Sequence, residues 1–218
     1  MVAPDPAPIR PSAPLSANRR DVLAGAALFA LAIGLPTLAA HQIALPADET
    51  PTPTEEAVLR RVCDIVVPAT DTPGALAVGV PAFVALALAH GLEGSRAPMA
   101  DAPAGAPLRA DGSLRHLTWL VQALMQAGGG AFLTLPPARQ VALVTALDAA
   151  AFPPGPPPAN PSPWVTLKAL ILDGYYGSEV GASQELQYNL VPGRWDPDIP
   201  LEPGARAYSS DWTAVDFG

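Results

Sequence analysis

Proline sets the tightest limit on the structures open to this 218-residue chain, which contains 28 of them. Proline lacks an amide hydrogen and its ring clashes with the preceding helical turn, so helix interiors and central strands exclude it. Residues 1–15 hold five prolines and read as an unstructured lead, and residues 153–163 hold seven and read as a stiff connector. Regular structure is therefore confined to the segments between such stretches.

Those segments carry helical periodicity. Apolar residues recur at helical spacing in five of them, which predicts helices over 54–67, 81–89, 113–127, 136–151 and 162–172. We expect Thr54 to start the first helix and Ser113 to cap the third. The fourth should bury Val141, Val144, Leu147 and Ala151. The fold class predicted is all-α: a small irregular domain of about five helices with Pro-rich loops, such as 95–111, and a long irregular C-terminal tail.

Residues 16–40 have the form of an export signal. Arg19 and Arg20 stand directly before Asp21, and a 19-residue apolar run follows from 22 to 40. A twin-arginine pair before a moderately hydrophobic stretch is typical of the bacterial twin-arginine export signal. We therefore expect residues 1–40 to be this signal, 41–53 a linker, 54–218 the helical domain, and the protein to be periplasmic.

A retained membrane anchor is the alternative interpretation of the same run. A membrane span needs about 20 apolar residues, and Gly25, Gly34 and Pro36 weaken this run as a span. Cleavage stays open, because 37–39 and 38–40 match the small-x-small cleavage pattern only approximately. An uncleaved signal would tether the protein to the inner membrane.

No cofactor motif is present in the sequence. No G-x-G-x-x-G follows a predicted strand, and there is no phosphate loop or C-x-x-C-H haem motif. The histidines, His41, His90 and His116, lack metal-ligand spacing. We expect His90 at a helix C-terminus, His116 in a surface or packing role, and the single cysteine, Cys63, to be a buried small hydrophobe. The net charge of −8, without a clustered basic face, argues against nucleic acid as a partner.

A turn and an aromatic tail complete the pattern. In the stretch 71–74, Pro73 and Gly74 suit the central positions of a type II turn, which needs a positive φ at its third residue. The tail after residue 187 has no periodicity but keeps large rings. Such rings need cover, either from the chain's own helices or from a partner subunit. The candidate interface aromatics are Tyr188, Trp195, Tyr208 and Trp212.

Two stretches resemble a known family. CDIVVPATDTPGALAVGVPAFV at 63–84 and LILDGYYGSEVGASQELQYNLVPGRW at 170–195 resemble the gluconate 2-dehydrogenase subunit 3 family, with similarity from about Glu55 to Trp212. The resemblance implies that the matching residues shape the fold and the surface that docks a partner, and that none is catalytic. These residues are Asp71, Thr72, Pro73, Gly74, Gly174, Tyr175, Tyr176, Gly177 and Ser178.

The resemblance also implies a role. In that family a flavoprotein large subunit of the glucose-methanol-choline type binds FAD and oxidises the substrate, and a multi-haem cytochrome c subunit often takes the electrons onward. The small subunit has no redox group. It binds the large subunit, supports its folding or maturation, and supplies the signal that exports the pair. We therefore expect a non-catalytic accessory subunit without a cofactor or metal of its own.

Two other classes of function stay open. A stand-alone exported enzyme would have Asp71, His90, His116 and Tyr175 as its best candidates, although no acid–base or metal spacing joins them. A structural protein anchored by its uncleaved N-terminal helix differs only in the fate of residues 1–40.

Overall fold

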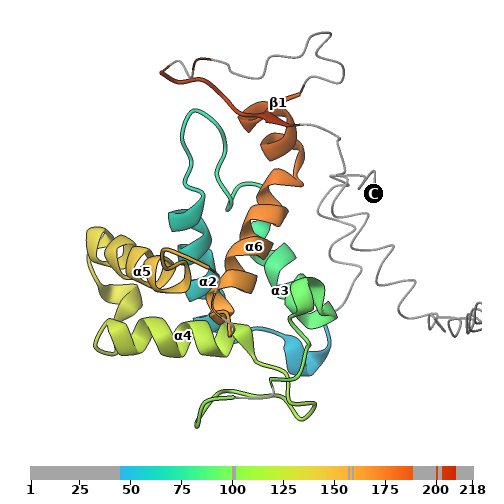
Figure 1. The fold of residues 1–218 in the computed structure, drawn as a ribbon, viewed down its shortest axis with the longest axis vertical. Helices are drawn as coiled ribbons and strands as arrows, with labels where there is room; N and C mark the ends of the chain where they lie inside the picture. The colour runs from blue at the N-terminus through green and yellow to red at the C-terminus, as the bar shows by residue number, and fades with distance from the viewer. Residues whose placement is uncertain are drawn as a thin grey trace, which may run out of the picture.

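The computed structural model describes residues 45–99, 102–156, 158, 160–188, 200 and 203–209, with residues 188, 208 and 209 described by backbone alone. Five α-helices dominate this part of the chain (Figure 1). They are α2 (Pro53–Val66), α3 (Val80–His90), α4 (His116–Ala127), α5 (Pro137–Ala151) and α6 (Pro163–Tyr176). The prediction of a small all-α domain is confirmed.

Short elements link these helices. The 3₁₀ turns are η2 (Ala47–Glu49), η3 (Leu92–Gly94) and η4 (Phe132–Thr134), and η5 (Gly181–Glu185) is a π-helical turn. Two strands of two residues each, β1 (Gln187–Tyr188) and β2 (Tyr208–Ser209), pair in parallel. Part of the stretch expected to be an irregular tail therefore returns to pair with the residues that follow η5.

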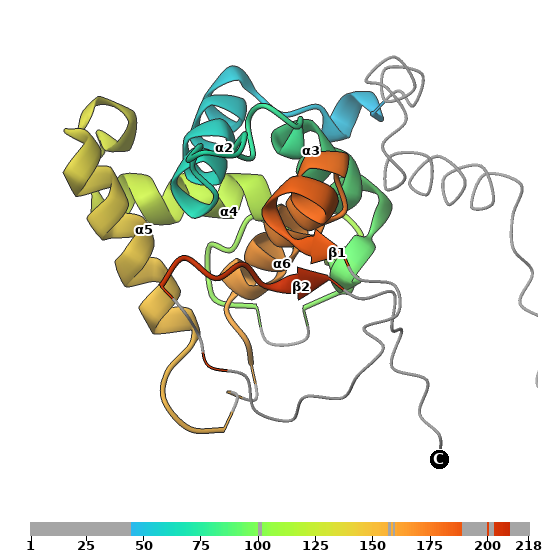
Figure 2. The same ribbon diagram turned by 90° about the horizontal axis from the view of Figure 1, so that it is seen from above.

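The central helix is α6, which packs against each of the other four α-helices. In Figures 1 and 2, α5 and α3 lie on opposite sides of it. Its sequence, PWVTLKALILDGYY, has few polar side chains, and an all-round apolar helix must be covered by neighbours. In the described part of the chain, no helix has both the length and the apolar character needed to cross a membrane.

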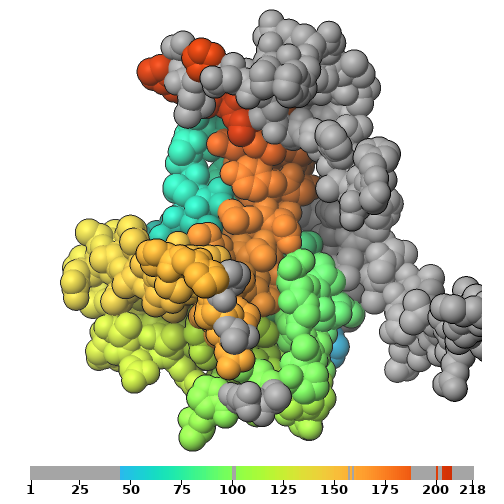
Figure 3. Space-filling view, viewed as in Figure 1, coloured from blue at the N-terminus to red at the C-terminus, as the bar shows by residue number. Residues whose placement is uncertain are grey.

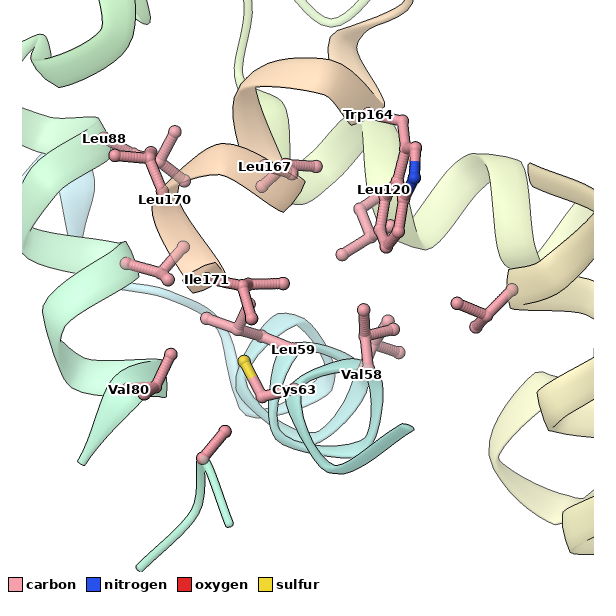
Figure 4. Packing of buried hydrophobic residues seen from close by; sticks show 14 of the residues in the cluster. Val58, Leu59, Cys63, Val80, Leu88, Leu120, Trp164, Leu167, Leu170 and Ile171 are labelled. Carbon is pink, nitrogen blue, oxygen red and sulfur yellow. The ribbon is translucent and has the colours of Figure 1, made fainter. Parts of the chain in front are cut away.

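The core forms where α2, α3 and α4 meet α6. Figure 4 shows Leu59 and Cys63 from α2, Val80 from α3 and Leu120 from α4 directed toward the buried face of α6. The α6 side chains in this core are Trp164, Leu167, Leu170, Ile171 and Tyr175. Cys63 is fully buried, as predicted, and burial raises the pKa of its thiol to about 12.

Helix α2 begins at Pro53, one residue before its predicted start at Thr54. Thr52, not Thr54, is the N-cap: its side chain accepts a hydrogen bond from the amide of Glu55, and the Glu55 carboxylate accepts one from the amide of Thr52 (2.9 Å). This reciprocal capping box satisfies two backbone donors, and Pro53 fits the first turn because its missing donor would have no helical partner there. Residues 45–52, expected as part of a linker, therefore include an ordered cap.

The prediction that Ser113 caps α4 is wrong. The helix begins at His116, and Ser113 instead donates from its hydroxyl to Asp111 (2.6 Å) in the preceding loop. Ser113 also forms an antiparallel bridge with Pro98 and is fully buried. The side chain is thus used to close the 95–115 loop on itself rather than to cap a helix.

The buried face predicted for α5 is partly wrong. Val144 and Ala151 are buried and Leu147 packs against the core, but Val141 is 43% exposed. Gln140 takes the inward position instead. Its amide donates to the carbonyl oxygens of Phe132 (2.9 Å) and Leu133 (3.2 Å), and its oxygen accepts from Arg61 (2.6 Å). A buried amide with all these partners carries little desolvation penalty, so Gln140 can be buried. Apolar spacing alone therefore predicted the wrong residue, Val141, at this inward position.

The loop between α2 and α3 departs from the predicted type II turn. Gly74 does not have the positive φ that such a turn requires at its third residue. It is needed for a different reason: a Cβ there would lie 2.5 Å from the amide nitrogen of Ala69 and 2.8 Å from the carbonyl oxygen of Val67. The neighbouring amide of Ala75 donates to that same Val67 carbonyl (3.0 Å), which holds the loop against the end of α2.

We expect Gly74→Ala to lower the free energy of unfolding by about 3 kcal/mol, since a methyl group would displace backbone atoms rather than a side chain. Urea denaturation of the purified chain measures this loss. Gly105→Ala is the matched control: its φ is +81° but nothing lies near the added methyl group, so the cost should be about 1 kcal/mol. Equal losses in the two variants would contradict the close approach.

Candidate functional site

The two sequence motifs meet at one end of the molecule. The Tyr175 hydroxyl donates to the carbonyl oxygen of Pro73 at 3.0 Å, across 102 residues of sequence. The hydroxyl of Thr72 donates to the carboxylate of Glu185 in η5. We call this contact between loop 67–75 and residues 174–185 the motif junction. Its position at the upper end of α6 is visible in Figure 1.

The glycine of the second motif lies within α6 rather than in a turn. The helix was predicted to end at residue 172 but continues to Tyr176, which places Gly174 in its last turn. A Cβ at Gly174 would lie 2.6 Å from Cδ1 of Phe83 in α3. Glycine has the lowest helix propensity after proline, but here it lets α3 and α6 approach closely, so packing outweighs propensity.

A tight turn follows α6 and closes the junction. The amide of Gly177 donates to the carbonyl oxygen of Asp173 (2.8 Å), and the Ser178 hydroxyl donates to that of Tyr175 (2.6 Å). The Ser178 oxygen in turn accepts from the amide of Gly181 (3.1 Å). Any Cβ at Gly181 would collide with the Tyr175 carbonyl oxygen. These polar groups satisfy the end of the helix and start η5.

Only part of the motif faces outward. Thr72, Gly74 and Tyr175 are buried, whereas the side chain of Asp71 is 82% exposed and Tyr176 is 41% exposed. The ring of Tyr176 meets that of Tyr175 edge to face, with centroids 5.2 Å apart. The junction thus offers a carboxylate and an aromatic ring to a partner, both on backbone that the buried motif residues hold in place.

Asp71 is held in its charged form. Hydrogen bonds from its own backbone amide and from Thr70, and then the charge of Arg206, lower the pKa of the Asp71 carboxyl below its ordinary value. The Arg206 guanidinium lies 3.3 Å from the carboxylate, and both groups are largely exposed to solvent. The contact is a surface ion pair, which contributes little to stability.

A second cluster of charges holds the residues that precede α2. The carboxylate of Glu49 binds Arg109 (2.6 Å) and Arg96 (2.7 Å), and the side chains of Glu49 and Arg109 are both 7% exposed. We call these three residues the N-terminal clamp. Burial acts to raise the pKa of Glu49, but the two guanidinium groups outweigh it and leave that pKa below its ordinary value. Removing one partner of so buried a pair leaves an uncompensated charge.

A small polar cavity adjoins the clamp. His116 lines it together with Glu55, Arg115 and Thr118. The ring of His116 is buried at the start of α4, with Nδ1 3.1 Å from the carbonyl oxygen of Leu114. Burial lowers the pKa of His116 to about 4, with the charge of Arg109 acting in the same direction and the Leu114 carbonyl opposing both. The predicted packing role for this histidine matches its position.

The candidates of the stand-alone enzyme interpretation do not form one cluster. Asp71 and Tyr175 lie at the motif junction, His90 ends α3, and His116 starts α4. Within the described residues, no hydrogen bond or ion pair joins any two of these four. The same part of the chain places no three of its His, Cys, Asp or Glu side chains so that they could hold a metal ion.

Several predicted residues lie outside this description. Arg19 and Arg20 of the export signal, and the rings of Trp195 and Trp212, are beyond the described residues. Tyr188 and Tyr208 are described by backbone alone, in β1 and β2. Their expected role as interface aromatics therefore stays a prediction.

Other residues of the site carried no usable sequence signal. Glu185 and Arg206 reach the junction only through folding, from positions 113 and 135 residues after their partners Thr72 and Asp71. The partners of the clamp, Glu49 and Arg109, are likewise 60 residues apart. Gly181 lies within the stretch 170–195 that resembles the family. Its spacing of four residues from Gly177 was the one sequence feature that marked it.

We expect Tyr175→Phe to lower the free energy of unfolding by about 1 kcal/mol, because the carbonyl of Pro73 loses a part-buried hydrogen bond from the buried Tyr175 ring. Thermal and urea denaturation measure the change. Tyr176→Phe is the matched control, since that ring is partly exposed and the change removes the same atom. A loss as large in Tyr176→Phe as in Tyr175→Phe would count against the junction hydrogen bond.

We expect the stability of the wild-type protein to fall as the pH drops from 6.5 toward 4. In the unfolded chain His116 is protonated below about pH 6.5, whereas in the folded chain it stays neutral to about pH 4. The unfolded state therefore binds more protons in this window. His116→Gln should remove about 2 to 3 kcal/mol of that loss. Denaturant unfolding at a series of pH values tests this, and parallel curves for the two proteins would contradict it.

Comparison with known proteins gives one family. No curated protein and no solved structure matches the chain. A family model described as gluconate 2-dehydrogenase subunit 3 matches residues 53–193, from the first turn of α2 to beyond β1, and so includes both motifs of the junction. The chain therefore belongs to the gluconate 2-dehydrogenase subunit 3 family.

Proposed function

We propose that this protein is the non-catalytic small subunit of a periplasmic, flavin-dependent sugar or alcohol dehydrogenase. Membership of its family makes it a subunit of a multi-subunit dehydrogenase. In the proposed complex the FAD belongs to a large subunit of the glucose-methanol-choline type, and a multi-haem cytochrome c subunit accepts the electrons. The small subunit supports folding of the large one and carries the twin-arginine signal for both.

The observation that carries the proposal is the division of the motif junction into an inner and an outer half. Gly74 lies close against backbone, Gly174 lies close against the ring of Phe83, and the Tyr175 hydroxyl is used in a part-buried hydrogen bond. Such residues fix a shape but have no free group with which to perform chemistry. Asp71 and Tyr176, which the shape presents outward, suit recognition of another protein, where aromatic and charged anchors dominate.

The positions of the two ends of α2 also favour a role in exporting a bound partner. The N-terminal clamp lies at the start of α2 and the motif junction at its end, so about 21 Å of helix separates them at 1.5 Å per residue. Figure 1 shows the residues just before α2 (blue), which include Glu49 of the clamp, and the motif junction at opposite ends of the helical body. A partner docked at the junction would leave the segment that joins the signal accessible to the export machinery.

We expect co-expression with the flavoprotein to be required for periplasmic dehydrogenase activity. Without this chain the flavoprotein should be inactive or remain in the cytoplasm. Changing Arg19 and Arg20 together to Lys should keep both proteins in the cytoplasm, because the paired arginines are the feature that defines the export signal. Acceptor-dependent activity and immunoblots of periplasmic and cytoplasmic fractions measure both outcomes.

A clear result against the proposal is full periplasmic activity of the flavoprotein in the absence of this chain. Unchanged export of the Arg19→Lys, Arg20→Lys variant would contradict the signal. Arg139→Lys, a change of the same type on the exposed surface of α5, controls for expression. Bound flavin, bound metal or turnover in the purified chain alone would instead support the stand-alone enzyme.

A further inference from the structure

Residues 203–209 lie at the motif junction, and 203–207 are exposed to solvent. We call this segment the strap. The amide of Gln187 donates to the carbonyl oxygen of Ala207 (2.8 Å), and β2 continues the pairing with β1. Arg206 donates to the carbonyl oxygen of Gln184 (2.7 Å) in η5 and lies 3.3 Å from Asp71. Figure 3 shows the strap (red) above the end of α6 (orange).

The strap is weakly held. Residues 203–207 are all exposed, so none of them contributes a buried side chain to the core. The ion pair of Arg206 with Asp71 is exposed, and an exposed pair contributes little. A parallel pair of two-residue strands is too short to be stable by itself. The strap can therefore leave the junction without disturbing the helices.

The strap also lies beside the feature best suited to binding, because Arg206 pairs with Asp71 while most of that carboxylate stays exposed. Loop 67–79 and residues 174–188 contain three charged residues, Asp71, Glu179 and Glu185, and all are acidic. Arg206 supplies the cation that this acidic end would otherwise lack. It does so beside Asp71, the one charged residue of the family motif, while the strap backbone occupies an edge of β1.

We propose that the strap is an intramolecular placeholder for the large subunit. In the complex, an extended segment of the large subunit that carries an arginine replaces it, with the guanidinium on Asp71 and the main chain on β1. This inference rests on the proposed function and adds to it the chemistry of the partner. Charge complementarity favours this occupant, since the uncovered surface is acidic and offers backbone donors and acceptors along a strand edge.

The proposal predicts competition between strap and partner. A site that is free for only a fraction of the time binds with an apparent affinity reduced by that fraction. Because an exposed ion pair is this weak, Arg206→Ala should bind the large subunit about 2- to 5-fold more tightly than wild type. Asp71→Asn should bind more weakly in the Arg206→Ala background, because it removes the charge that the partner guanidinium uses. With Arg206 present the loss should be smaller, because the same change also releases the strap.

Relative affinity is measured by competition in the intact complex. Purified complex with a fluorescently labelled wild-type small subunit is mixed with unlabelled variants, and the concentration that displaces half of the label gives relative affinity. Arg139→Ala, an exposed arginine on α5, is the matched control and should equal wild type. Deletion of residues 203–207 removes the exposed part of the strap without relying on one side chain and keeps Tyr208 and Trp212, and it should also displace the label better than wild type.

Hydrogen exchange of the small subunit alone gives an independent measurement, in which Arg206→Ala should speed exchange of the Gln187 amide. If Arg206→Ala and the 203–207 deletion displace the label no better than wild type, or less well, the strap is not a placeholder and the proposal is overturned. Unchanged exchange at Gln187 would overturn it as well. Failure of the wild-type chain to form any complex would instead reject the proposed function, and the placeholder with it.

Discussion

The structure depends on one constraint: α6 has almost no side that can face water. Thr166, Lys168 and Asp173 are its few polar side chains, and five of its large apolar or aromatic side chains are fully buried. Such a helix must be surrounded, and α2, α3, α4 and α5 do this. The proline-containing connectors 95–111 and 153–163 suit this arrangement, because they let the outer helices reach α6 from different sides.

Much of this arrangement could be predicted from the sequence. Proline and glycine mark helix ends through local chemistry that needs no partner, which is why the five helices appear close to their expected places. Apolar spacing found the inward-facing Val144 and Leu147 of α5. It failed at Val141, since a helix apolar on most sides does not say which side is inside and Gln140 found buried hydrogen-bond partners.

The candidate site was predictable as residues but not as geometry. The family motifs named Asp71 to Gly74 and Gly174 to Ser178, yet only the folded chain shows that one tyrosine hydroxyl joins them. Gly74 was expected to supply a left-handed turn, and instead it makes room for the backbone of residues 67–69. The clamp of Glu49 with Arg109 and the strap contact of Arg206 are ion pairs between residues far apart in sequence, and no local sequence pattern predicts such pairs.

The burial of Cys63 has a practical consequence. Its sulfur is fully covered by core side chains, and the raised pKa keeps the group as a thiol rather than a thiolate. Only the thiolate attacks disulfides or alkylating agents, and only when it can be reached. Since the chain has a single cysteine, a maleimide labels a molecule only after its core has opened, so the labelling rate measures core opening without any engineered probe.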